Sequence, residues 1–163
     1  MQNGARSKQS GLKCHGIGEH RKQVGREGER LAAEHLERLA WQITDRNWRA
    51  GRYGEIDIVA VDPTGCLVFI EVKARVAGKF FQEQGFVTAG FEKLDWRKRA
   101  KLRNTANMYM ARQGHQFNAC RFDAIIVYLP LHFCACADNS WADDVGIKEC
   151  LLDVEIQHVQ AIF

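Results

Sequence analysis

Apolar side chains recur along this chain at spacings that predict two amphipathic helices. In residues 23–40, apolar and small positions return every three or four residues, which is typical of a helix with one buried face. Residues 92–112 show a similar spacing, with a mostly apolar stripe beside a stripe of lysine, arginine and asparagine. Both segments should therefore pack through one face against a second layer of structure.

Elsewhere the pattern changes to one that predicts β-strands. The expected strands cover residues 43–49, 54–60, 68–73 and 121–129, with a last strand and turn in residues 150–163. The link at residues 62–65 contains proline and glycine, and it favours an antiparallel hairpin of the second and third strands. This order of elements predicts an α/β domain with a central mixed β-sheet flanked by helices.

Residues 1–22 contain scarcely an apolar side chain and are rich in glycine, serine, glutamine and lysine, so we expect a flexible basic tail there. Residues 23–163 should form a single domain, for which a hydrophobic content of 46% is ample. The net charge is only +3, so the chain is not a highly basic coat for nucleic acid. Its basic residues gather near the N-terminus and in residues 93–112, which makes their distribution more informative than their total.

The two strands of the expected hairpin carry charges where burial calls for apolar side chains. Because side chains alternate along a strand, Glu71 and Lys73 share one face, and the hairpin brings Asp57 beside them. Two neighbouring carboxylates repel each other, which a raised pKa or a bound divalent cation resolves. With a lysine alongside, the arrangement fits metal-assisted hydrolysis of a phosphodiester. The alternative is a surface salt bridge between Glu71 and Lys73, next to a strand that merely ends at Asp57.

The second helix adds further basic side chains. Lys98 stands in the otherwise apolar stripe, where it either reaches a phosphate at the edge of the site or lies on a solvated flank. Lys93, Arg97 and Lys101 belong to the polar stripe and are candidate contacts to a nucleic-acid backbone. Most charged helix faces are simply solvated, so the residues alone leave both interpretations open.

Six short motifs, in their order and spacing, resemble the bacterial YraN family over roughly residues 23–163. They are Gly25-Arg26-Glu27-Gly28-Glu29, Arg46-Asn47-Trp48-Arg49, Gly54-Glu55-Ile56-Asp57, Phe69-Ile70-Glu71-Val72-Lys73, Arg121-Phe122-Asp123 and His158-Val159-Gln160-Ala161-Ile162-Phe163. That family is similar to the PD-(D/E)XK superfamily of nucleases, and most of all to the archaeal Holliday-junction resolvases. The resemblance implies a restriction-endonuclease-like fold.

The resemblance also implies roles for individual residues. Asp57 matches the catalytic aspartate of the superfamily, Glu71 and Lys73 match its Glu-x-Lys, and Glu29 matches the helix-borne glutamate of the resolvases. Asp57, Glu71 and Glu29 would then be ligands of Mg²⁺ or Mn²⁺. Lys98 matches a family lysine before a Leu-x-x-x-Ala-x-x-Tyr pattern, which favours a catalytic role for it.

The residues alone give Glu29 a different interpretation, namely an exposed helix carboxylate paired with Arg26 or Arg30. Gly25 and Gly28 weaken the start of the same helix, a cost that makes sense where the backbone must closely approach a phosphate or another element. The resemblance reverses the ordinary assignment of Glu29 and places it in the site.

The chain departs from the family pattern in three places. Ala40 stands where the family usually has a glycine before an aromatic residue, and residues 78–94 and 131–146 are longer than the family's connectors. These departures concern substrate choice more than chemistry. The pair Cys134 and Cys136 invites a zinc interpretation, but no second matched pair accompanies it, and incidental cysteines in a loop are the better explanation.

Two classes of function therefore compete. The first is a metal-dependent endonuclease, with structured or branched DNA favoured over RNA as its partner. The second is a non-catalytic nucleic-acid-binding protein that keeps the nuclease fold. The chain has neither a long apolar run nor the apolar core of a signal peptide, so we expect a cytoplasmic protein with no membrane partner. A homodimer is compatible with this interpretation.

Overall fold

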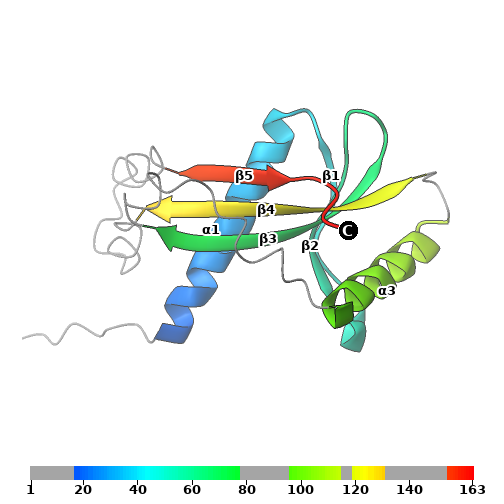
Figure 1. Cartoon of the computed structure of the whole chain (residues 1–163), viewed down its shortest axis with the longest axis horizontal. Helices are drawn as coiled ribbons and strands as arrows, with labels where there is room; N and C mark the ends of the chain where they lie inside the picture. Colours follow the sequence, from blue (N-terminus) through cyan, green and yellow to red (C-terminus); the bar gives the residue numbers. More distant parts are fainter. Residues whose placement is uncertain (1–16, 78–95, 115–118, 131–153) are drawn as a thin grey trace, which may run out of the picture.

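The computed structural model describes residues 17–77, 96–114, 119–130 and 154–163. Its elements are α1 (Ile17–Arg38), β1 (Gln42–Arg49), the short 3₁₀ helix η1 (Gly51–Tyr53), β2 (Glu55–Val61), β3 (Leu67–Ala77), α3 (Trp96–Arg112), β4 (Cys120–Pro130) and β5 (Glu155–Val159). The strands form one sheet, and Figure 1 shows α1 passing behind β3, β4 and β5 and α3 at the lower right near β2.

The five strands lie side by side in their order along the chain, from β1 to β5. Neighbours pair antiparallel, except β3 and β4, which are parallel. Antiparallel strands can follow one another through a tight turn, whereas parallel strands need a crossover, and α3 lies on the crossover between β3 and β4. The predicted mixed α/β fold is confirmed, and it is compatible with a restriction-endonuclease-like architecture.

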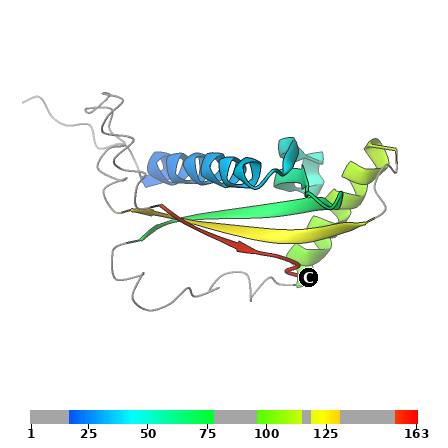
Figure 2. The same ribbon diagram turned by 90° about the horizontal axis from the view of Figure 1, so that it is seen from above.

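The alternating side chains of β3 divide the core between the two faces of the sheet. Val68, Ile70 and Val72 pack in the cluster that includes the buried face of α1. Phe69 packs in the other cluster, with Tyr109 and neighbouring residues of α3. Figure 2 shows α1 lying along one side of the sheet. Each helix thus covers a different face, and the strand between them carries both the core and the charged residues predicted for the site.

The helix α1 begins earlier than the sequence pattern predicts, at Ile17 rather than at residue 23. The expected tail of residues 1–22 was therefore wrong over residues 17–22, while residues 1–16 lie outside the described part. The cause is that the first turns of α1 are mostly exposed, so no buried stripe marks their start. Helix α3 begins at Trp96, and the residues expected before it also lie outside the described part.

The end of α1 explains the departure at Ala40. This residue has a positive φ of 61°, directly after the helix, and the amide of Trp41 donates back to the carbonyl of Leu36 at 3.0 Å. A left-handed residue at this position commonly closes a helix, and glycine adopts that conformation without strain. Ala40 therefore occupies a position whose backbone suits the glycine that the resemblance predicts.

Candidate active site on strands β2 and β3

Asp57 lies one residue beyond the last paired position of the β2–β3 hairpin, where Ile58 faces Ile70. Its Oδ2 accepts a hydrogen bond of 2.8 Å from the backbone amide of Val72. The carboxylate thus reaches across to β3, where the backbone ladder ends, and it lies next to Glu71. The predicted proximity of Asp57 to the Glu-x-Lys segment is confirmed.

Glu71 receives two lysines on the same oxygen. Its Oε1 lies 2.5 Å from Nζ of Lys73 and 2.8 Å from Nζ of Lys98. The Glu71 side chain is only 11% exposed. The salt bridge between Glu71 and Lys73 that the alternative interpretation predicted is present, but it lies in a half-buried cluster and not on an exposed edge. Lys98 extends from α3 to the strand and pairs with Glu71, although its side chain is 42% exposed.

Glu29 reaches the same region from α1. Its Oε2 accepts a hydrogen bond of 3.0 Å from Nδ2 of Asn47, and its charge acts on Asp57. Arg30 is paired instead with Glu27 and Glu34 on its own helix. The placement of Glu29 therefore follows the resemblance and not the expectation from the residues alone.

Asn47 is a residue of this region to which the sequence pattern assigned no role. It has a positive φ of 52° inside β1, a conformation that asparagine tolerates better than most residues. This backbone turns its amide toward Glu29. The only signal in the sequence was its membership of the motif Arg46-Asn47-Trp48-Arg49.

A glycine lets α1 approach the strand closely enough to deliver Glu29. A Cβ placed on Gly28 would lie 2.5 Å from Cβ of Ala74 on β3, which real side chains do not tolerate, whereas a Cβ on Gly25 would meet nothing within 4 Å. The expected close approach is therefore confirmed for Gly28, and the partner is β3. No contact among the described residues explains Gly25.

The electrostatic environment separates the two central carboxylates. Burial, followed by the charge of Glu71, raises the pKa of Asp57 to about 6, although the amide of Val72 and the charge of Lys73 oppose this shift. Burial also tends to raise the pKa of Glu71, but the hydrogen bonds from Lys73 and Lys98 outweigh it and the pKa falls below its ordinary value. Glu71 is therefore ionised at neutral pH, and Asp57 carries its charge at a cost.

We call Glu29, Asp57, Glu71, Lys73 and Lys98 the site cluster. Among the described residues, no three acidic, histidine or cysteine side chains are arranged as a ready metal-binding group. The donor set nevertheless fits a hard divalent cation, because its acidic members supply only carboxylate oxygens. The raised pKa of Asp57 points the same way, since a cation beside it would offset the repulsion from Glu71.

A second polar cluster lies at the start of β4, and we call it the structural cluster. Nη1 of Arg121 lies 2.5 Å from Oδ2 of Asp62, and Nε of Arg121 lies 3.1 Å from Oδ1 of Asp123. Asp123 is fully buried, and it also contacts Nε2 of His158 at 3.0 Å and accepts from the amide of Ala161 at 2.9 Å. These contacts join the β2–β3 turn, β4 and the segment after β5.

Both carboxylates of the structural cluster have a lowered pKa. Burial alone would raise the pKa of Asp62, but hydrogen bonds from Thr64, Arg121 and Cys66 more than offset it. For Asp123, burial is again opposed by hydrogen bonds, from His158, the amide of Ala161 and Arg121. The structural cluster therefore favours its charged state.

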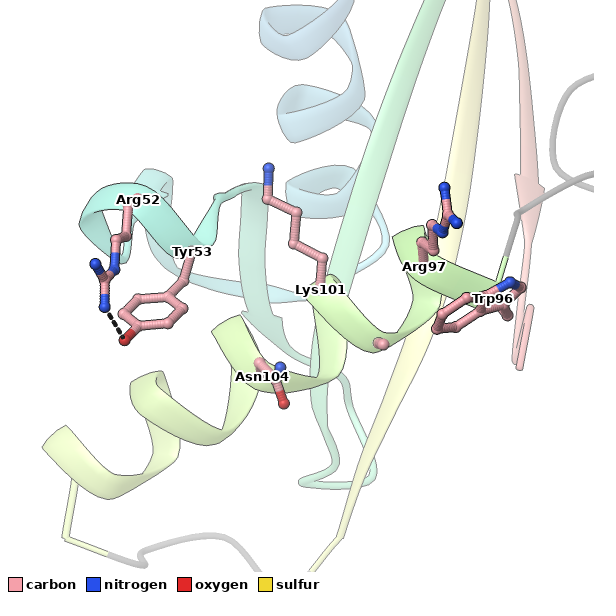
Figure 3. A pocket seen from close by; sticks show the side chains of 7 residues that line it. Arg52, Tyr53, Trp96, Arg97, Lys101 and Asn104 are labelled. Atoms are coloured by element: carbon pink, nitrogen blue, oxygen red, sulfur yellow. Dashed lines mark hydrogen bonds between the residues drawn. The ribbon is translucent and has the colours of Figure 1, made fainter.

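The basic stripe of α3 divides between two surroundings. Arg97 and Lys101 line an open pocket together with Arg52, Tyr53, Trp96, Ala100 and Asn104 (Figure 3). The guanidinium groups of Arg99 and Arg103 lie 5.7 and 5.3 Å from the ring centre of Phe163 instead. Lys93 lies outside the described residues. The sequence pattern identified Arg97 and Lys101 but not the aromatic side chains beside them.

Fold and site together define a mixed α/β protein whose carboxylates and lysines converge on the end of one hairpin. The family model of UPF0102, an uncharacterised protein family, matches residues 28–127. A UPF0102 protein of Desulforamulus reducens is 37% identical over 109 residues, which are 66% of this chain and 83% of that protein. A UPF0102 protein of Mycobacterium avium is 40% identical over 104 residues, which are 63% of this chain and 75% of that protein. The chain belongs to the UPF0102 family, also called YraN, and the predicted membership is confirmed.

None of the helices in the described part of the chain is both long enough and apolar enough to cross a bilayer.

Proposed function

We propose that this protein is a metal-dependent endonuclease that acts on DNA, with structured or branched DNA as the preferred substrate. The observation that carries the proposal is the pairing of Asp57 and Glu71 on adjacent strands, with two lysines on Glu71. Phosphodiester hydrolysis needs carboxylates that hold a cation and nearby positive groups that stabilise the developing charge, and this arrangement offers both. A DNA substrate implies a cytoplasmic location.

Each side chain has a distinct part in this proposal. Asp57, Glu71 and Glu29 would hold Mg²⁺ or Mn²⁺, which when bound polarises a phosphoryl oxygen and lowers the pKa of a bound water. Lys73 orients the attacking water or stabilises the charge that develops on the phosphoryl oxygens. Lys98 contacts the phosphate beside the scissile bond, for which it must leave Glu71. Asn47 fixes the direction of the Glu29 carboxylate.

The second candidate is a nucleic-acid-binding protein without turnover. The observation that favours it is the tight engagement of Glu71 by Lys73 and Lys98, which leaves this carboxylate neutralised by the protein itself. In that case the basic residues would hold a phosphate backbone, and the carboxylates would only position the lysines.

The substitution Asp57→Asn separates the two candidates, with Glu55→Gln as the matched control on the same strand. Glu55 is exposed and forms a salt bridge with Arg49. We expect Asp57→Asn to weaken binding of Mg²⁺ or Mn²⁺ in calorimetric titrations and to slow cleavage by roughly a hundred-fold or more. Cleavage is measured on junction, flap and linear DNA and on structured RNA. Glu55→Gln should change neither quantity.

Equal metal affinity and equal cleavage for the parent and Asp57→Asn would contradict the proposed site. If the protein binds nucleic acid but cleaves none of the substrates with either cation, the second candidate is favoured. Faster cleavage of RNA than of DNA would support the proposed phosphodiester hydrolysis but contradict DNA as the substrate.

A further inference from the structure

The pocket between η1 and α3 combines exposed aromatic rings with cationic groups. It has a volume of about 350 Å³. Trp96 is 71% exposed and Tyr53 is 44% exposed, which is unusual for side chains of this size. Figure 3 shows the two rings at opposite ends of the pocket, with Lys101 and Asn104 between them. We call this the stacking pocket.

Each ring is accompanied by an arginine. The guanidinium of Arg52 lies 5.2 Å from the ring centre of Tyr53 and donates to its hydroxyl at 3.3 Å. The guanidinium of Arg97 lies 5.3 Å from the ring centre of Trp96. An aromatic surface with a fixed positive charge beside it is suited to a flat ligand that carries phosphate.

The backbone is shaped to bring the two halves of the pocket together. Gly54 has a φ of 139°, which glycine tolerates best, and a Cβ there would lie 2.9 Å from Cε of Lys101 and 3.2 Å from Oγ1 of Thr105, so η1 and α3 are in close contact at this position. The hydroxyl of Thr105 lies 2.8 Å from the carbonyl oxygen of Lys101 on its own helix and 3.3 Å from the carbonyl oxygen of Tyr53, so it also contacts η1. The pocket is therefore a built feature of the fold.

We propose that the stacking pocket binds an unpaired stretch of DNA, with its bases on Trp96 and Tyr53 and its phosphates on Arg52, Arg97 and Lys101. The bases of an intact duplex are stacked on one another and cannot reach these rings, so the rings contribute to binding only where the strand is unpaired. This inference rests on the proposed function, which it deepens by naming the substrate class.

The stacking pocket is connected to the site cluster through α3. Lys98 extends inward to Glu71, while its neighbour Arg97 lines the pocket, and Lys101 follows one turn later. A strand whose unpaired bases lie in the pocket would therefore pass its backbone close to the site cluster. Substrates with a single-stranded tail or gap beside a duplex fit this arrangement.

The test compares a blunt DNA duplex with the same duplex carrying a short oligothymidine tail. Affinities are measured by fluorescence anisotropy in a buffer free of divalent cations, so no substrate is cleaved. The parent should bind the tailed duplex more tightly than the blunt one. Trp96→Ala should weaken binding of the tailed duplex by roughly 5- to 150-fold, the range for loss of one base–aromatic stack, and leave the blunt duplex unchanged.

Three further variants make the result specific. Trp96→Phe should retain most of the preference, because it keeps an aromatic face, and Tyr53→Ala should reduce it independently. Met108→Ala removes another exposed apolar side chain of α3 outside the pocket and should change nothing. Trp96 is largely exposed, so its substitution should not unfold the domain, which circular dichroism checks.

Equal affinity of the parent for both duplexes, or an unchanged preference in Trp96→Ala, would overturn the inference. Tighter binding of a uridine tail made of RNA would overturn the choice of DNA. If the protein prefers the tailed duplex but cleaves no substrate, the stacking-pocket inference stands and the proposed nuclease activity is rejected. If cleavage requires Asp57 but the tail does not improve binding, the nuclease proposal stands and the stacking-pocket inference is rejected. Failure to bind any nucleic acid would reject both.

Discussion

The site cluster and the structural cluster both combine carboxylates with basic side chains, but the pKa of Asp57 in the first is shifted in the opposite direction from those of Asp62 and Asp123 in the second. In the structural cluster, Asp62 and Asp123 both have a lowered pKa, because Arg121 and other donors surround them. In the site cluster, the pKa of Asp57 is raised to about 6 by burial and by the charge of Glu71. One cluster stabilises the charges it holds, and the other maintains a charge against its surroundings.

This difference separates residues that hold the fold from residues available for chemistry. In balanced ion pairs the protein itself neutralises each charge, so no ligand is needed to stabilise them. A carboxylate kept in an unfavourable environment persists because the fold over-determines it, and such groups concentrate at functional sites. Three predictions test the comparison, beginning with the largest expected effect.

Asp123→Ala should be far more destabilising than Asp57→Asn. Removal of the fully buried Asp123 leaves Arg121 and His158 without a shared partner, and we expect a loss of about 3–5 kcal/mol in the free energy of unfolding. Asp57→Asn removes a disfavoured charge and keeps an oxygen for the amide of Val72, so the free energy of unfolding should stay unchanged or rise. Urea unfolding at neutral pH with a chelator measures both.

Equal losses for the two variants would mean that Asp57 is a structural residue, and the distinction between the clusters would then fail.

Gly28→Ala should disturb the site cluster through its supporting backbone. The added Cβ has no room beside Ala74, so α1 must shift and carry Glu29 with it, at a cost of about 1–3 kcal/mol. Gly25→Ala is the matched control on the same helix, where open space allows a gain of up to about 1 kcal/mol from helix propensity. Thermal or urea unfolding of both variants checks this.

A Gly28→Ala protein as stable as Gly25→Ala would show that α1 does not need close contact with β3. If only cleavage fell, the helix would still be required to position Glu29.

Stability should depend on pH through the structural cluster. Asp62 and Asp123 have folded-state pKa values below the unfolded value of about 3.9, so their contribution is present above that pH and is lost as pH falls through the folded pKa. The facing groups are Arg121 for both carboxylates and His158 for Asp123. We expect the urea midpoint to fall below about pH 5, and less steeply in Asp62→Asn.

An equally steep fall in Asp62→Asn would place the acid sensitivity elsewhere in the protein.

The sequence pattern predicted the strand-borne part of the site cluster well. Glu71 and Lys73 interrupt an apolar strand with the right period, and the turn at residues 62–65 implied the hairpin that brings Asp57 to them. Lys98 was visible as a lysine in an apolar stripe, and the structure turns it inward to Glu71. Local periodicity is sufficient where neighbours in space are also neighbours along one hairpin or one helix.

Other parts depended on contacts that periodicity does not encode. Glu29 meets Asn47 through a left-handed backbone within a strand, and no alternation of polar and apolar residues announces that conformation. Tyr53 and Trp96 come from two distant segments that meet where η1 contacts α3, so their pocket exists only in the folded chain. The start of α1 was missed because its exposed turns have no buried face.

The single parallel pairing of the sheet divides the molecule by how quickly its parts can form. Strands β1, β2 and β3 are joined by short turns, so Asp57, Glu71 and Lys73 meet through contacts that are local along the chain. The pairing of β3 with β4 must close a much longer loop, so we expect it to form after the hairpin contacts. Three of the five residues of the site cluster are thus brought together by a meander of local contacts, and completion of the sheet provides the support on which their geometry rests.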